Sequence, residues 1–192
     1  MRAVMLDVPE RLLEQRRRMG ADVFDEVWEG VLHMVPPPSS HHQRLGARLV
    51  ANLLPLAEAR GLVTLYETAL RRKGTGWDDY RVPDLIVARH EHVSDEAVEG
   101  PALLVVEILS PGDETYDKLG FFAELGVEEV LVVEPLTKAV ELFVLRGGRL
   151  VAALPDGDGT VTLSSLGLRV STLETTDGAS LRLTGSGGTA DI

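Results

Sequence analysis

Two acidic residues interrupt strongly apolar stretches of the sequence, and their chemistry needs an explanation. Asp84 follows Pro83 and opens the run DLIVA, and Glu107 lies inside LLVVEIL. An ionised carboxylate in apolar surroundings costs several kcal/mol unless a partner compensates its charge. A divalent cation can do so, since Mg²⁺ is held by one or two carboxylates together with water and phosphate oxygens. The structural alternative is that Asp84 caps a strand entrance and Glu107 pairs with an arginine or points to solvent.

Lys118 favours the catalytic interpretation of these two acids. Residues 91–134 contain 12 acidic side chains, and Lys118 is the only basic residue among them. Two carboxylates on neighbouring strands can hold one metal ion, and a nearby lysine can position the attacking water or neutralise charge developing on phosphate. The three residues together predict a site for metal-dependent hydrolysis of phosphodiester bonds.

Length and composition exclude several other classes of protein. The chain has 192 residues, no cysteine and a formal net charge of −11. One domain is expected at this length, and the lack of cysteine excludes disulfides, thiol nucleophiles and cysteine-ligated zinc or iron–sulfur sites. No stretch has the apolar length of a signal peptide or a membrane span, so we expect a soluble, cytoplasmic protein with no membrane partner.

The acidic charge argues against a nucleic-acid partner, because phosphate binding relies on basic surface. A local basic edge could still provide such a surface. Its candidate residues are Arg71, Arg72, Lys73, Arg81 and the run Arg16, Arg17 and Arg18.

The first third of the chain is predicted to hold two helices and a hairpin. Residues 9–19 read as a short helix, and alternating apolar residues over 22–35 indicate a hairpin. A longer helix begins at Ser39 or Ser40, which can cap it, and Pro55 is expected to kink or end it.

From residue 62 onwards the apolar pattern is that of strands. The predicted strands cover residues 62–72, 82–89, 102–109 and 128–135, with a helix over 114–125. A strand, a helix and a strand in this order predict a parallel pair with a crossover. A further hairpin is expected through residues 147–148, and residues 184–192 are expected to be a disordered tail.

The ordered set of motifs resembles the Uma-type restriction-endonuclease family, a branch of the PD-(D/E)XK nuclease superfamily. The family pattern is a Pro-Asp pair, an acid in an apolar strand followed by Ser-Pro, a lysine heading a helix, and Gly-Val before the next strand. The matching residues are Pro83, Asp84, Glu107, Ser110, Pro111, Lys118, Gly126 and Val127. Upstream, Glu26, Gly30 and His42 lie at corresponding places, so the resemblance covers roughly residues 20–135.

From its length we expect the chain to form a single domain, over residues 1–183. The resemblance implies an α/β (α+β) fold, a restriction-endonuclease-like mixed β-sheet flanked by helices with additional antiparallel hairpins. It implies that Asp84 and Glu107 bind Mg²⁺ or Mn²⁺, with the Ile108 carbonyl as a further ligand. Lys118 would orient or activate the attacking water. The superfamily usually places its lysine two residues after the second acid, which is Leu109 here, so Lys118 is a relocated equivalent.

Several further residues keep two interpretations. Glu26 resembles the acid that many such nucleases contribute from their N-terminal region, and it equally fits a half-exposed hairpin acid. His42 fits the site, although a surface or capping histidine is the preferred reading. The acids Asp113, Glu114 and Asp117 could add charge to the site or serve the start of a helix.

Two functions from different classes follow from these patterns. The first is a Mg²⁺-dependent endodeoxyribonuclease with Asp84, Glu107, Lys118 and Glu26 as its catalytic residues and DNA as its partner. The second is a nuclease-fold protein that no longer cleaves and serves as a binding or assembly module, which the net charge and the unusual lysine position favour. A homodimer is also expected, formed by apolar C-terminal strands that pair across a two-fold axis.

Overall fold

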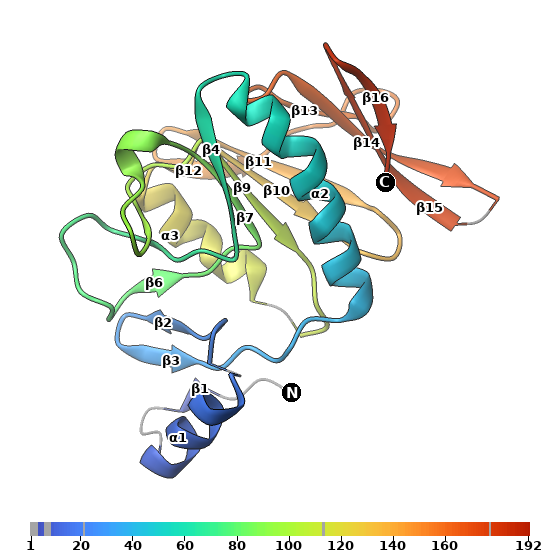
Figure 1. The fold of residues 1–192 in the computed structure, drawn as a ribbon. Helices are drawn as coiled ribbons and strands as arrows, with labels where there is room; N and C mark the ends of the chain where they lie inside the picture. The colour runs from blue at the N-terminus through green and yellow to red at the C-terminus, as the bar shows by residue number, and fades with distance from the viewer. Residues whose placement is uncertain (1–3, 6–8, 21, 113, 177) are drawn as a thin grey trace.

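A six-stranded mixed sheet forms the centre of the molecule (Figure 1). The computed structural model describes residues 4–5, 9–20, 22–112, 114–176 and 178–192. The strands of the central sheet, in spatial order, are β12 (Arg149–Ala152), β11 (Val140–Arg146), β10 (Glu129–Val133), β9 (Leu104–Ile108), β7 (Leu85–Arg89) and β4 (Leu62–Tyr66). β9 and β10 are parallel, and the other neighbours are antiparallel. The predicted parallel pair and the predicted α+β class are confirmed.

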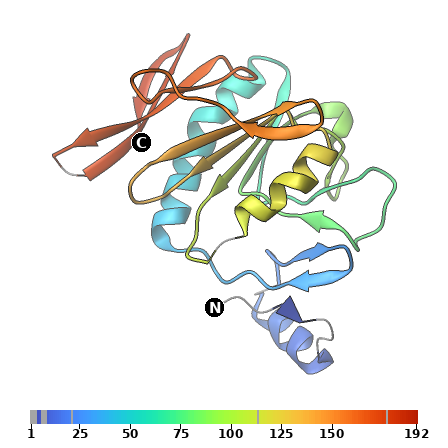
Figure 2. The same cartoon turned by 180° about the vertical axis from the view of Figure 1, so that it is seen from behind.

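Helices cover both faces of this sheet, which explains why β7, β9 and β10 are almost continuously apolar. On one face, α2 (Ser40–Glu58) packs Leu45, Leu49 and Leu53 into a cluster that includes Leu85 and Leu104. On the other face, α3 (Leu119–Glu124) contributes phenylalanines to a second cluster (Figures 1 and 2). The predicted helix over 114–125 is divided, because η2 (Thr115–Lys118) is a 3₁₀ turn that leads into α3.

The start of α2 follows the expected capping chemistry. The Ser39 side chain accepts a hydrogen bond from the His42 amide at 3.2 Å, which satisfies one of the free donors of the first turn. Pro55 does not end the helix, which continues to Glu58. Ala57 is fully buried, so packing holds the last turn despite the donor that proline lacks.

The N-terminal part forms a second sheet beside one end of the central sheet. Its order is β1 (Val4–Met5), β3 (Val31–His33), β2 (Glu26–Trp28), β6 (Tyr80–Arg81), β5 (Leu70–Arg71) and β8 (Val98–Glu99). The predicted hairpin is confirmed, since β2 pairs with β3. The turn that joins them contains Glu29 and Gly30, which both have positive φ. α1 (Glu10–Met19) is confirmed as the predicted N-terminal helix. A 3₁₀ turn, η1 (His90–His92), follows β7.

The C-terminal part forms a third, antiparallel sheet and corrects one prediction. Its strands are β13 (Val161–Leu163), β14 (Leu168–Thr175), β15 (Gly178–Gly185) and β16 (Gly188–Asp191). Residues 184–192 are therefore an ordered hairpin end rather than a disordered tail. Ile192 is buried and exchanges backbone hydrogen bonds of 2.8 and 2.9 Å with Leu181. Strand pairing stabilises this glycine-rich segment, which local propensity does not favour. The homodimer through these strands stays a prediction.

In the part of the chain that the structure describes, no helix has the length and apolar character needed to span a bilayer.

Candidate active site

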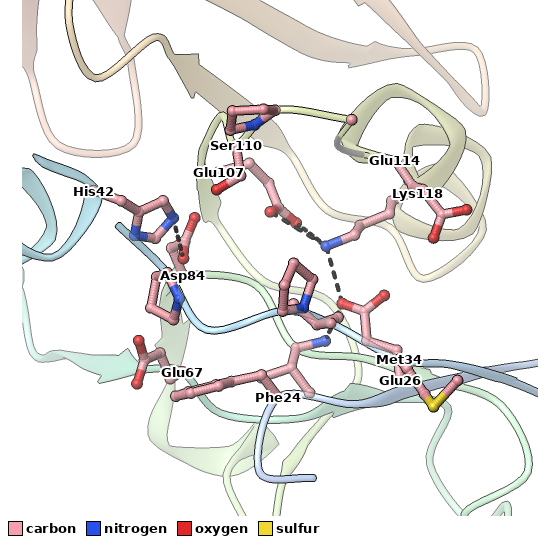
Figure 3. Close-up of a pocket in the computed structure, with 16 residues that line it drawn as sticks. Phe24, Glu26, Met34, His42, Glu67, Asp84, Glu107, Ser110, Glu114 and Lys118 are labelled. Atoms are coloured by element: carbon pink, nitrogen blue, oxygen red, sulfur yellow. Dashed lines mark hydrogen bonds and ion pairs between the residues drawn. The ribbon is translucent and has the colours of Figure 1, made fainter. Parts of the chain in front are cut away.

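A pocket with a cavity of about 120 Å³ opens where β9 ends and the chain enters β7 (Figure 3). Its walls come from four separate segments: the N-terminal hairpin, the start of α2, the strand ends and the loop that leads to η2. The lining includes five acidic residues and one lysine: Glu26, Glu67, Asp84, Glu107, Glu114 and Lys118. The structure thus brings the predicted catalytic side chains into one cavity.

Strand register places the two predicted metal-binding acids side by side. β7 and β9 pair Leu85 with Val106, and one further step of this antiparallel register sets Asp84 opposite Glu107. Directly opposed residues of an antiparallel pair have Cβ atoms ~5 Å apart on the same face. The Ile108 amide donates a hydrogen bond of 2.6 Å to Asp84 Oδ2, which ties the loop before β7 to the end of β9.

Lys118 reaches the same point from the start of α3. Its Nζ donates to Glu107 Oε1 at 3.1 Å and to Oε2 at 3.3 Å, and it lies 2.9 Å from Glu26 Oε1. All three side chains are buried, with at most a tenth of each exposed. The 3₁₀ turn η2 brings Lys118 back over Glu107, so a lysine outside the usual strand position still meets the second acid.

Glu26 is a buried member of this cluster, and the interpretation as a half-exposed hairpin acid is wrong. The side chain is 2% exposed, accepts a hydrogen bond from the Val82 amide at 2.8 Å, and accepts another from Trp28 Nε1 at 2.7 Å. These donors orient the carboxylate toward Lys118. Trp28 therefore serves as an anchor for Glu26.

His42 lies in the pocket, which corrects the preferred reading as a surface or capping histidine. The residue is 5% exposed, and its Nε2 is 3.1 Å from Asp84 Oδ1. The signal for this burial was in the sequence, because His42 is three, seven and eleven residues before Leu45, Leu49 and Leu53, which form the buried face of α2.

Glu67 is a lining residue that the sequence patterns did not identify. It follows β4 with φ +47, and its amide donates to the Asp84 carbonyl at 3.0 Å. Gln43 Nε2 donates to Glu67 at 3.0 Å, and the Tyr66 hydroxyl donates to Gln43 at 2.8 Å. Burial, and then the charge of Glu67, raises the pKa of Tyr66, so the hydroxyl remains protonated as the donor of this chain.

The loop before η2 is held by a histidine that was also missed. His33 Nδ1 lies 2.8 Å from Glu114 Oε2, and the His33 ring stacks on Trp28 with centroids 4.1 Å apart. Glu114 therefore lines the pocket, as one of its two interpretations allowed. Asp117 is exposed, and Asp113 lies outside the described residues.

The basic edge considered for nucleic acid does not form as expected. Arg81 is 5% exposed, lies between the rings of Trp28 and Phe121, and pairs with Asp79. Burial lowers the pKa of Arg81, while the hydrogen bond and charge of Asp79 oppose that shift. Other arginines of this expected edge also form ion pairs: Arg16 with Asp25, Arg71 with Glu99, and Arg72 with Glu124.

The charges of the pocket fit a divalent cation. Glu26 and Glu107 both contact the Lys118 ammonium. Asp84 lines the same pocket beside His42, so carboxylates outnumber ammonium groups there. Such an excess of buried negative charge favours a further positive group. Within the described residues, no three His, Asp or Glu side chains are grouped closely enough to hold an ion by themselves. Asp84 and Glu107 would therefore need water or backbone ligands, which is usual for Mg²⁺. Ile108 could contribute only a backbone ligand to such a site, because its side chain is packed in the core cluster that α2 covers.

Comparisons with known proteins agree with this architecture. The family described as "Uma2: Putative restriction endonuclease" matches residues 10–175. Among solved structures, the chain is similar to the crystal structure of a putative nuclease of the DUF820 group from Anabaena variabilis. The identity is 17% and the TM-score 0.60, over 74% of this chain and 82% of that chain. No curated protein matches the sequence. Because the family match spans most of the chain, including every predicted site residue, this protein belongs to the Uma2 family.

Proposed function

We propose that this protein is a metal-dependent endonuclease that hydrolyses phosphodiester bonds of DNA. The observation that carries the proposal is the register of β7 and β9, which sets Asp84 and Glu107 side by side in a pocket where Lys118 also points. Two carboxylates and a lysine at one point are the groups that phosphoryl transfer to water needs. The description of the Uma2 family supports the same reaction class.

Each residue has a separate task in this mechanism. Asp84 and Glu107 would hold Mg²⁺ or Mn²⁺ together with the Ile108 carbonyl, and the bound ion would offset negative charge on the phosphate and make water more acidic. Lys118 Nζ would hold the attacking water beside the carboxylates. Glu26 keeps the ammonium of Lys118 in place from the opposite side, at 2.9 Å.

His42 is placed to orient the first acid. Its Nε2 faces one oxygen of Asp84, and the Ile108 amide donates to the other oxygen at 2.6 Å. A carboxylate that is held at both oxygens loses little rotational freedom when it binds a ligand, which favours a defined coordination geometry.

A second function, a nuclease-fold module that binds without cleaving, is favoured by one observation. Lys118 contacts carboxylates on both sides, Glu107 and Glu26, so its ammonium is already neutralised where a substrate phosphate would approach. In such a module the cluster would be a structural ion pair, and partner binding would not depend on metal.

Cleavage of duplex DNA in the presence of Mg²⁺ or Mn²⁺ separates these functions. We expect Asp84→Asn and Glu107→Gln each to lower the cleavage rate at least ~10²-fold, because each removes a charge that holds the ion. Asp95→Asn, in an exposed loop, is the matched control and keeps the wild-type rate. Unfolding curves establish that all variants are folded. Equal cleavage by the wild type and both site variants would reject the proposal, and metal-independent binding without cleavage would favour the module.

A further inference from the structure

Three basic residues form an exposed stripe along α2. His41, Arg44 and Arg48 are spaced by three and four positions, and all three are exposed. At 3.6 residues per turn this spacing places them on one side of the helix, with Arg44 and Arg48 ~6 Å apart along its axis. The stripe lies outside the face that buries His42, Leu45 and Leu49.

Lys138 adds a fourth basic group from the turn between β10 and β11. This turn lies beside α2 in both views of the fold (Figures 1 and 2). Burial lowers the pKa of Lys138, Glu134 opposes that shift, and the charges of Arg44 and Arg48 lower the pKa further. The three cations are thus close enough to repel one another. We call His41, Arg44, Arg48 and Lys138 the α2 basic patch.

Ion pairs do not neutralise the α2 basic patch, unlike most arginines of the basic edge considered above. Among the described residues, neither Arg44, Arg48 nor Lys138 has a carboxylate within 4.0 Å, although Arg16, Arg71 and Arg81 do. Glu134, the acid beside Lys138, is held by its own turn, where it accepts hydrogen bonds from the Leu136 amide at 2.9 Å and the Thr137 hydroxyl at 2.7 Å. The patch therefore presents positive charge in a chain whose net charge is −11.

The patch lies at the same end of the central sheet as the pocket. His41 directly precedes His42, which lines the pocket. The turn with Lys138 follows β10, whose last residue, Val133, is paired with Ile108 beside Asp84. A polyanion that reaches from the pocket along α2 would meet the patch next.

We propose that the α2 basic patch binds the phosphate backbone of the duplex DNA whose cleaved bond lies in the pocket. This inference rests on the proposed function. Arginine guanidinium groups match phosphate oxygens in a bidentate geometry, and two of them one helical turn apart can follow consecutive phosphates. Single-strand binding surfaces rely on aromatic stacking platforms, and the patch contains no Phe, Tyr or Trp, which favours a duplex.

The salt dependence of DNA binding tests this assignment directly. The variant Arg44→Gln/Arg48→Gln is compared with Arg146→Gln/Arg149→Gln, which removes the same charge from exposed arginines at the β11–β12 turn. That turn lies at the other end of β11, ~20 Å from the pocket end. All proteins carry Asp84→Asn to prevent cleavage, and a fluorescent 20-base-pair duplex is titrated in 50 to 200 mM NaCl.

We expect the slope of log Kobs against log [NaCl] to become less steep by ~1.8 in the α2 variant, since each lost phosphate contact accounts for ~0.9. The slope of the control variant stays within ~0.3 of the parent value. Adding Lys138→Gln to the α2 variant should remove a further ~0.9. Three outcomes would each overturn the inference. They are equal slopes for the two double variants, stronger binding of single-stranded DNA through the patch, and no DNA binding by the parent protein. In a further outcome, the slope depends on the patch as expected but the protein with Asp84 intact does not cleave DNA. That result would reject the proposed function but support the patch as a phosphate-binding surface.

Discussion

Two buried glutamates on neighbouring parallel strands are stabilised in opposite ways. Glu107 lies near the end of β9 and Glu129 at the start of β10, and each is 3% exposed. Glu129 accepts hydrogen bonds from the Ser164 amide at 2.7 Å, the Ser165 amide at 3.1 Å and the Ser165 hydroxyl at 2.5 Å. Glu107 instead meets the ammonium of Lys118.

The kind of partner, rather than burial, separates a structural acid from a candidate catalytic one. Neutral donors from the loop after β13 satisfy Glu129 in place, so its carboxylate needs no further ligand. Glu107 lines a pocket, and its ammonium partner is shared with Glu26. A shared cation leaves excess negative charge at the pocket, which is why we propose Glu107, and not Glu129, as a metal ligand.

The largest expected effect comes from removing the cation between the two pocket acids. We expect Lys118→Met to lower the free energy of unfolding by ~3–5 kcal/mol, because Glu107 and Glu26 would face each other without compensation. Urea unfolding followed by circular dichroism measures this loss. Adding Glu107→Gln should recover part of it, and Mg²⁺ should stabilise Lys118→Met more than the wild type. An unchanged unfolding midpoint for Lys118→Met would show that the cluster does not need its ammonium.

A smaller effect is expected at the structural acid. Glu129→Gln replaces an acceptor of three hydrogen bonds by a group with one donating end, so the free energy of unfolding should fall by ~1–3 kcal/mol. DNA cleavage per folded molecule should stay at the wild-type rate, in contrast to Glu107→Gln. Loss of cleavage in folded Glu129→Gln would remove the distinction between the two glutamates.

The smallest effect is expected at Glu134, a partly buried acid that directly follows β10. Burial alone would raise the pKa of Glu134, but hydrogen bonds from Thr137 and Leu136 outweigh it and lower the pKa. A carboxylate whose pKa is lowered by folding stabilises the folded state at pH values above its unfolded pKa. This stabilisation is lost as the pH falls through the folded pKa. We expect Glu134→Gln to cost ~1 kcal/mol or less at pH 7 and less than that at pH 3. Paired urea titrations at the two pH values measure the difference, and a deficit as large at pH 3 as at pH 7 contradicts this interpretation.

Apolar periodicity in the sequence was sufficient to predict the central architecture. The dense apolar runs at β7, β9 and β10 need burial on both faces, and the helix between β9 and β10 allows only a crossover connection, so a parallel pair followed. The same reasoning identified Asp84 and Glu107, because a charge within an apolar run requires compensation wherever the strand lies.

Only the tertiary structure decided how those charges are compensated. Lys118 meets Glu26 across 92 positions of the chain, and His42 meets Asp84 across 42, so no local spacing encodes either contact. The burial of Arg81 between Trp28 and Phe121 also depends on partners distant in sequence. A local pattern specifies which face of an element must be buried, because that preference belongs to each side chain. Which donor meets which acceptor depends on how the elements pack, and that is a property of the folded chain.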